Sequence, residues 1–185
     1  LEPIYEAKFY KHSYGFRPFR STHHAVVRCK DLIGRRGYTY AIEGDIRKCF
    51  DRIHHIQLLK ILRRTIKDER IVHLVRDMLK AGCMEDGAWQ ITDEGIPQGG
   101  IVSPLLANIY LNELDWFVAA KWDMISEAER MRRKRRGIAQ PCFIVRYADD
   151  FVVLVSGSRE LAEQLKAEIA DFLDAELHLE LSEEK

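Results

Sequence analysis

Two adjacent carboxylates, Asp149 and Asp150, lie between two short apolar runs of the chain. The runs 143–145 and 151–155 are rich in β-branched residues and too short for typical helices, so each predicts a buried strand. Residues 147–150 then form the tight turn of a hairpin, where aspartate is well tolerated. Two like charges at this turn repel each other, and a divalent cation would relieve the repulsion. The alternative interpretation is an ordinary polar turn with solvated aspartates.

A third carboxylate, Asp45, ends a β-prone stretch that begins at Tyr38, and the aromatic residue Phe50 follows it. An acid at the end of a strand, with a bulky ring shortly after it, matches the first catalytic motif of nucleic-acid polymerases. The same residues also fit a plain strand-to-helix junction with Asp51 or His54 near the cap, and Phe50 then belongs to the core. The residues alone leave both interpretations open.

A glycine-rich loop at 95–100 precedes an apolar helix. Gly99 and Gly100 permit close approach of the backbone to a ligand. Ser103 is expected as the N-cap of the helix, with Pro104 at the first helical position. The pattern is also typical of a simple loop that leads into a helix.

The elements that must position these residues follow from hydrophobic periodicity. Amphipathic spacing predicts helices, and alternation predicts strands. We expect helices at 22–36, 57–65, 68–81 and 158–176, strands at 38–45 and 176–181, and a hairpin at 83–92 around Asp86-Gly87.

Length and composition indicate one globular domain, or one and a half, with room for a core. No apolar run approaches the roughly 18 residues that span a bilayer, and the N-terminal residues do not form a signal peptide. Cys29, Cys49, Cys83 and Cys142 form no Cys-x-x-Cys pair, so neither zinc sites nor disulfide frameworks are expected. A reducing, cytoplasmic setting fits best.

The formal net charge is zero, which argues against a protein that simply coats nucleic acid. The charges are unevenly distributed, because residues 1–36 hold eight Lys or Arg against three Asp or Glu, and residues 157–185 hold three against nine. Such asymmetry suits a protein that offers one face to nucleic acid, and it is also common in proteins that bind none.

Two segments have a composition typical of RNA contact. Residues 1–20 interleave aromatic and basic side chains, which either stack bases and hold phosphates or bury their rings against the domain. The run 130–136 is basic at every position but Met131, and is either a solvated helix end or an insertion that reaches RNA phosphate. The predicted RNA-binding residues are Arg17, Arg20, Arg132, Arg133, Lys134, Arg135 and Arg136.

The motifs resemble, in the same order along the chain, those of reverse transcriptases encoded by bacterial and organellar group II introns. Residues 13–18 are similar to the fingers motif, with a departure at Phe19, where the family usually has a small residue, often glycine. Residues 45–50 resemble the first palm motif, 97–115 the second, and 146–151 the Tyr-Ala-Asp-Asp hairpin.

This resemblance implies an α+β fold, the palm of a right-hand polymerase with partial fingers and a small antiparallel sheet backed by helices. Residues 1–36 would be partial fingers and 37–185 the palm. Within the palm, fingers-type helices are expected at about 55–95 and a basic insertion near 121–140. The thumb, maturase and endonuclease domains of the family are not expected within this sequence.

The resemblance also implies a two-metal nucleotidyl transfer, in which a primer 3′-hydroxyl attacks the α-phosphate of a deoxynucleotide. Two Mg²⁺ ions, replaceable by Mn²⁺, would be held by Asp45, Asp149 and Asp150 with the main-chain carbonyl of Ile46. Phe50 matches the steric gate, whose ring leaves no space for a 2′-hydroxyl. The implied nucleotide-binding residues are Ile46, Lys48, Cys49, Phe50, Gln98, Gly99 and Ala148, and Lys185 is a candidate general acid.

The implied function is that of an RNA-directed DNA polymerase, the enzyme of a group II intron-encoded protein, which supports intron mobility and, in the full protein, splicing. Its implied partners are an intron RNA template, a DNA or RNA primer and dNTPs, with no membrane. Its implied location is the bacterial cytoplasm, associated with the nucleoid, or an organellar matrix. Two alternatives stay open: a reverse transcriptase of another bacterial lineage, and a maturase module that mainly docks on intron RNA.

Overall fold

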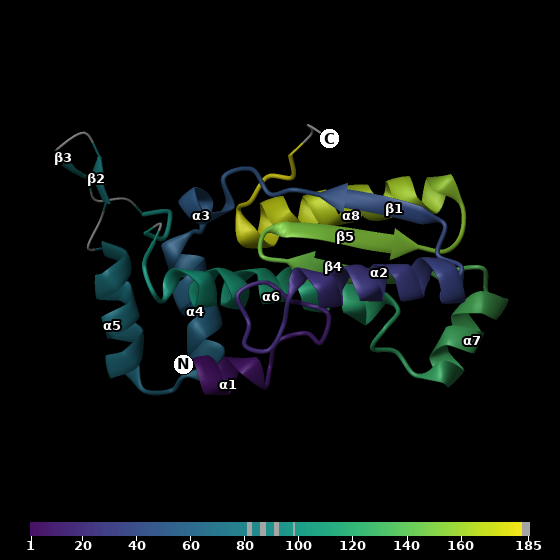
Figure 1. Ribbon diagram of the computed structural model, residues 1–185, viewed down its shortest axis with the longest axis horizontal. Coiled ribbons are helices and arrows are strands. Elements are labelled where there is room, and N and C mark those ends of the chain that lie inside the picture. Colours follow the sequence, from purple (N-terminus) through teal and green to yellow (C-terminus); the bar gives the residue numbers. More distant parts are fainter. Residues whose placement is uncertain (81–82, 86–87, 91–92, 98, 183–185) are drawn as a thin grey trace.

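The computed structural model describes residues 1–80, 83–85, 88–90, 93–97 and 99–182 (Figure 1). In this part of the chain, no helix is both long and apolar enough to cross a membrane. The elements, in chain order, are α1 (Glu2–Glu6), α2 (Thr22–Arg36), β1 (Tyr40–Gly44), α3 (Cys49–Arg52), α4 (His55–Thr65), α5 (Glu69–Lys80), β2 (Cys83–Glu85), β3 (Ala88–Gln90), α6 (Ser103–Lys121), α7 (Glu127–Arg135), β4 (Cys142–Tyr147), β5 (Asp150–Val155) and α8 (Arg159–Leu177).

A three-stranded antiparallel sheet, in the order β1-β5-β4, lies at the centre of the fold. β4 and β5 form a hairpin whose last pair is Tyr147 with Asp150. β1 pairs with the other edge of β5 and ends with Gly44 opposite Phe151. This register brings the end of β1 beside the hairpin turn.

Helices cover both faces of this sheet, as Figure 1 shows. On one face lies α2, whose Arg28 guanidinium sits 5.3 Å from the centre of the Phe143 ring. On the other face lies α6, where the Cys142 thiol is 3.9 Å from the Val118 carbonyl oxygen. Neighbouring strand residues point to opposite faces, so the strand β4 must be apolar on both. The continuous apolar run of its sequence is the result.

The helix α6 is buried on most of its sides because it packs against β4, α4 and α8. The Tyr110 hydroxyl donates a 2.6 Å hydrogen bond to the carbonyl oxygen of Leu177 at the end of α8. The rings of Phe117 and Phe172 stack with their centroids 4.1 Å apart. The helix α6 therefore supports one face of the sheet.

Most of the predicted elements are confirmed, with small shifts at their ends. α2 covers the predicted residues and stops at Gly37, whose φ of 70° gives the left-handed cap that glycine favours. α4, α5 and α8 match the predicted helices, and Ser158 caps α8 through the amide of Leu161. β2 and β3 pair as the predicted hairpin. The turn at Asp86-Gly87 lies outside the described residues.

The predicted strand at 176–181 is wrong. α8 continues to Leu177, and His178 ends it in a left-handed conformation with φ of 52°. Leu181 makes only an isolated bridge with Ile46. Leu177 and Leu179 are both buried, one at the helix end and one just past its cap, so their spacing imitates the alternation of a strand.

Ser103 is not the N-cap of α6, as the sequence had predicted. The helix begins at Ser103 itself, with Val102 at the cap position. The Ser103 hydroxyl donates a 2.6 Å hydrogen bond to the carbonyl oxygen of Pro97 instead. This bond ties the start of the helix to the loop before it.

The N-terminal aromatic residues divide between the two predicted roles. Tyr5, Phe9, Tyr10 and Tyr14 are buried and belong to the core. Two other rings remain at the surface, since Phe16 is 55% and Phe19 is 101% exposed. Both of these residues also have positive φ angles, 56° and 59°. Phe19 therefore takes the backbone conformation that explains a preference for glycine at this position.

Candidate active site

The hairpin turn leaves Ala148 and Asp149 as a two-residue loop between β4 and β5. Ala148 has a φ of 57°, in the left-handed region that residues with a Cβ rarely adopt. Two-residue hairpin loops require such an angle because the twist of the turn must match that of the strands. Ala148 is buried and Asp149 half-buried, whereas Asp150 is exposed. Asp149 is therefore not a freely solvated turn residue.

Asp45 lies at the same end of the sheet as this turn. It directly follows Gly44, which pairs with Phe151 at the start of β5. A Cβ on Gly44 would lie 2.0 Å from the Phe151 ring, so a side chain at this position would clash with that ring. The Asp45 carbonyl accepts a 2.8 Å hydrogen bond from the amide of Ser182, which holds the backbone after the strand.

The carboxylates at this end of the sheet are close enough to influence one another. Burial raises the pKa of Asp149, and the negative charges of Asp150 and Asp45 raise it further. The Arg146 guanidinium acts in the opposite direction and lowers the pKa of Asp149. A bound cation would remove the repulsion between these carboxylates.

The carboxylates at this end of the sheet are oxygen donors of the kind that a hard cation such as Mg²⁺ prefers. Among the residues that the structure describes, no group of three His, Cys, Asp or Glu side chains is arranged to hold a metal ion. Mg²⁺ is typically bound by one or two protein carboxylates, with substrate phosphates and water as its other ligands. Asp45, directly after β1, and Asp149, in the turn before β5, are two carboxylates at this end of the sheet.

The chain turns sharply after Asp45 and starts the short helix α3. Lys48 precedes this helix with a φ of 49°, and Cys49 at its start is buried. Burial, followed by the charge of Asp149, raises the pKa of the Cys49 thiol to about 12. The thiol therefore stays neutral and packs as a small apolar side chain. The amides of Asp51 and Arg52 donate to the Lys48 carbonyl oxygen at 3.0 and 3.1 Å, which closes this single turn.

Phe50 lies between the N-terminal segment (residues 1–20) and the loop before α6. Its ring meets the ring of Phe16 edge-on, with the centroids 6.2 Å apart and an interplanar angle of 89°. Its carbonyl oxygen accepts a 2.8 Å hydrogen bond from the amide of Ile96. Gly95 packs so closely against this helix that its Cβ, if present, would be 3.1 Å from the Asp51 carbonyl oxygen. The half-buried Phe50 is thus held from two sides.

A comparison with protein families matches residues 1–185 to the family described as reverse transcriptase (RNA-dependent DNA polymerase). The chain belongs to the reverse transcriptase family. The fold class and the family predicted from the sequence are both confirmed.

Two bacterial proteins are similar to this reverse transcriptase chain over its whole length. Protein YkfC of Escherichia coli is 37% identical over 202 residues, and the group II intron-encoded protein LtrA of Lactococcus lactis is 37% identical over 229 residues. The chain spans only 53% of the first protein and 38% of the second. Other relatives come from mitochondria, among them a mitochondrial protein of Marchantia polymorpha.

Solved structures show the same fold at low sequence identity. The telomerase of Candida albicans, solved in complex with a fragment of telomeric RNA, aligns with a TM-score of 0.64 at 14% identity. The alignment covers 100% of this chain and 31% of the telomerase. At this identity the likeness concerns the fold alone. Divalent metal ions are used generally by reverse transcriptases and related polymerases.

The N-terminal segment of this reverse transcriptase docks against the hairpin, which the sequence did not reveal. The Tyr14 amide donates to the Arg146 carbonyl oxygen at 2.9 Å, and the Arg146 amide donates to the His12 carbonyl oxygen at 3.0 Å. Gly15 follows, and a Cβ there would lie 2.2 Å from the backbone nitrogen of Ala148. The fingers motif and the Tyr-Ala-Asp-Asp turn are therefore in direct contact.

Of three further predicted site residues, the structure describes only Gly99. Gly99 is exposed with a φ of 85°, three residues after the amide that bonds Phe50. Gln98 and Lys185, predicted to contact the nucleotide and to act as a general acid, lie outside the described residues. The positions of these two side chains therefore stay predictions.

The prediction that Arg17 binds RNA is contradicted by its position. Its side chain is 3% exposed and forms an ion pair with Glu6 at 2.9 Å. The same guanidinium donates to the carbonyl oxygens of Tyr10 and Ser13, both at 2.9 Å. A buried cation with these partners supports the N-terminal segment and does not present its charge to a phosphate.

Arg20 is partly accessible, beside a groove of about 1040 Å³ between the N-terminal segment and α2. Its guanidinium donates to the Lys11 carbonyl oxygen at 2.5 Å and lies 5.5 Å from the centre of the Tyr14 ring. The groove has a mixed charge, since Glu6 and Asp31 line it together with basic residues.

The basic run belongs largely to α7, at the end of the sheet opposite the turn (Figure 1). Arg133 is anchored to the fold, because it pairs with Glu129 at 3.0 Å and donates to the Lys121 carbonyl oxygen at 3.0 Å. Arg132 also pairs with Glu129, and Lys134, Arg135 and Arg136 are exposed. RNA held by these exposed residues would lie away from the turn at Asp149.

Proposed function

We propose that the complete protein is an RNA-directed DNA polymerase of the group II intron-encoded type, and that this chain is its palm with part of its fingers. The observation that carries this proposal is the convergence of Asp45 and Asp149 at one end of the sheet, in a chain of the reverse transcriptase family. Residues 1–36 would be the fingers part and 37–185 the palm, with a basic insertion near 121–140.

Asp45 and Asp149 would hold Mg²⁺, with Asp150 as a third carboxylate and the main-chain carbonyl of Ile46 as a further ligand. Bound Mg²⁺ would lower the pKa of the primer 3′-hydroxyl and neutralise the charge that develops on the pyrophosphate. Asp45 directly follows β1 and Asp149 directly precedes β5, and the hydrogen bonds that set the register of these strands would keep the two carboxylates in place. Their repulsion makes a cation the favoured occupant.

The remaining residues would bind and orient the nucleotide. The amide groups at Lys48 and Cys49 would face the triphosphate, and the Phe50 ring would pack against the sugar and exclude a 2′-hydroxyl. Gln98, Gly99 and Ala148 would border the base pair at the primer end. Arg20, Arg132, Lys134, Arg135 and Arg136 would contribute to binding intron RNA.

Relatives from bacterial and mitochondrial introns support a role in intron mobility, with splicing assistance from the full protein. The place of action would then be the bacterial cytoplasm, near the nucleoid, or an organellar matrix. The substrates would be an intron RNA template, a DNA or RNA primer and dNTPs.

Primer extension on an RNA template with Mg²⁺ and dNTPs tests this proposal in the full-length protein. Asp149→Ala is expected to abolish extension, whereas Asp171→Ala, which removes an exposed acid of α8, is expected to leave it unchanged. Extension by Asp149→Ala near the wild-type rate would refute the assignment of the site. An inactive wild type that still binds intron RNA tightly would favour the maturase module that only docks on RNA.

A further inference from the structure

Arg146 occupies the interior of β4, a position where a charged side chain must be fully paired. Its side chain and that of Asp115 in α6 are both 0% exposed. The guanidinium binds the Asp115 carboxylate with two nitrogens, Nε at 2.9 and 3.1 Å and Nη2 at 2.7 Å. This bidentate pair fixes the plane and the direction of the guanidinium.

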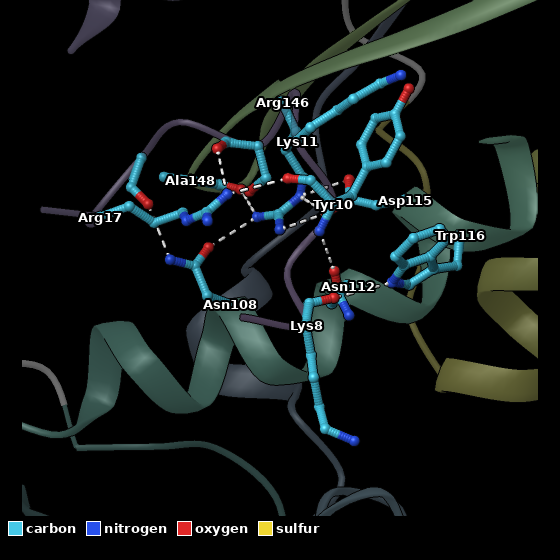
Figure 2. A network of polar contacts seen from close by, with 12 residues as sticks. Lys8, Tyr10, Lys11, Arg17, Asn108, Asn112, Asp115, Trp116, Arg146 and Ala148 are labelled. Atoms are coloured by element: carbon cyan, nitrogen blue, oxygen red, sulfur yellow. Dashed lines mark hydrogen bonds and ion pairs between the residues drawn. The ribbon is translucent and has the colours of Figure 1, made fainter. Parts of the chain in front are cut away.

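The remaining nitrogen of Arg146 reaches the turn that carries Asp149. Nη1 donates to the carbonyl oxygen of Ala148 at 2.6 Å and to Oδ1 of Asn108 at 3.0 Å. Figure 2 shows the guanidinium at the centre of this network, between α6 and the turn. A rigid, planar side chain thus connects the buried helix to the backbone immediately before Asp149.

Asn108 extends the network to the N-terminal segment. Its amide nitrogen donates to the Gly15 carbonyl oxygen at 2.8 Å, while its oxygen accepts from Arg146 (Figure 2). Gly15 also lies against the backbone nitrogen of Ala148. The peptide groups on both sides of Ala148 are therefore held, one by contact with Gly15 and the other by the hydrogen bond from Arg146.

The conformation of Ala148 explains why such support is needed. A left-handed φ is costly for a residue with a Cβ, and it persists only where the surroundings determine it strongly. A buried ion pair is a poor way to gain stability, because well-packed apolar residues often replace it without loss. An apolar pair would fill the same volume, but it would not hold the Ala148 carbonyl.

We infer that Arg146 is a positioning residue for the catalytic turn, and that Asp115 and Asn108 direct its guanidinium so that the Ala148 carbonyl, and with it Asp149, keeps one place. This inference rests on the proposed function, since it gives the turn its catalytic meaning. Arg146 touches neither substrate nor nucleotide in this role; it acts through the backbone of Ala148.

The test compares three variants of the full-length protein in primer extension. Arg146→Met combined with Asp115→Leu removes both charges together, so that neither is left buried and unpaired. Arg146→Lys keeps the charge but not the planar fork. The control, Lys121→Met combined with Glu168→Leu, removes a partly buried ion pair between the far end of α6 and α8.

The Arg146→Met/Asp115→Leu variant is expected to fold with a native circular dichroism spectrum and to lose at least 10-fold in kcat. Its KM for the primer–template is expected to stay unchanged, and its half-saturating Mg²⁺ concentration to rise. Amide hydrogen exchange is expected to accelerate at residues 147–150 and not in α8. Arg146→Lys is expected to lie between this variant and the wild type, and the control to match the wild type.

Two outcomes would overturn the inference while the wild type is active. One is a wild-type kcat in the folded Arg146→Met/Asp115→Leu variant, and the other is unchanged exchange at the turn. Should that variant fail to fold, a wild-type kcat and Mg²⁺ dependence in Arg146→Lys would overturn it equally. An inactive wild type would instead reject the proposed function, so the two failures can be distinguished.

Discussion

The ring of Phe16 meets the ring of Phe50 edge-on, and the two residues come from segments that are far apart in the sequence. Phe16 adopts a left-handed backbone angle and remains 55% exposed, so its ring is not there to fill the core. If Phe50 is the steric gate, Phe16 supports the gate from the side of the N-terminal segment. The fingers motif then contributes to the selection of the sugar.

Sugar selectivity should change when either ring is removed. We expect Phe50→Ala to lower the ratio of deoxynucleotide to ribonucleotide incorporation at least 10-fold. Phe16→Ala should lower it about 2- to 10-fold, because an aromatic pair contributes roughly 0.5–1.5 kcal/mol. Steady-state kcat/KM for dNTP and rNTP gives both ratios. Phe19→Ala is the matched control, since the Phe19 ring is fully exposed. An unchanged incorporation ratio in Phe16→Ala would show that the Phe16 ring does not contribute to sugar selection.

Gly15 should tolerate no side chain. A Cβ at this position would lie 2.2 Å from the Ala148 nitrogen, so Gly15→Ala must displace either the turn or the N-terminal segment. We expect a loss of about 1–3 kcal/mol in the free energy of unfolding, as for other overpacked sites, and a loss of activity. Urea denaturation and primer extension measure these effects.

Gly34→Ala is the matched control for this substitution. Gly34 lies within α2, and a Cβ there would meet nothing within 4 Å. Because alanine is the better helix former, this variant should gain up to about 1 kcal/mol. Equal stability of the two alanine variants would contradict the close packing of Gly15 on the turn.

Low pH should destabilise the folded protein through His12 in the N-terminal segment. Burial lowers the pKa of His12 to about 3, with the charges of Arg28 and Lys11 acting in the same direction and Asp123 opposing them. The pKa of His12 in the folded protein lies below its value in the unfolded chain. Below about pH 6.5 the unfolded state therefore binds more protons, and the free energy of unfolding decreases as the pH decreases. At pH 5 the loss would be at most about 2 kcal/mol.

The variant His12→Asn isolates this effect because asparagine does not titrate. Urea denaturation of the variant and the wild type at pH 7 and pH 5 is the measurement. We expect the wild type to lose more stability than the variant over this interval. Parallel losses in both proteins would assign the acid sensitivity to other groups.

The exposed end of the basic run should bind RNA electrostatically. Arg135→Gln combined with Arg136→Gln should weaken RNA binding and reduce the slope of log K against log salt by about 1.4, if each arginine contacts one phosphate. Filter binding at several salt concentrations measures this slope. Arg159→Gln combined with Lys166→Gln removes the same charge from exposed positions of α8 and should leave the slope unchanged. A larger change of the salt slope in the Arg159→Gln/Lys166→Gln variant than in the Arg135→Gln/Arg136→Gln variant would indicate that the run is a solvated helix end.

The sequence by itself determined the elements and the family. The apolar, β-branched runs on both sides of Asp149 and the amphipathic spacing of the helices are local signals, carried by residues within a few positions of one another. Local signals failed where different structures share one spacing, as at 176–181, where a helix end imitated a strand. They also failed for Arg17, because composition does not show which cations are buried.

Only the tertiary structure decided how the candidate site is held together. Arg146 finds Asp115 and Asn108 at separations of 31 and 38 residues, and Asn108 finds Gly15 at a separation of 93. The one sequence signal was a charged residue within an apolar strand. Such a residue indicates that a buried partner exists, but it does not identify the partner. Partners of this kind are selected by packing between elements, whereas periodicity and capping act within one element. The turn at Asp149 could therefore be read from the chain, but the residues that keep it in place could not.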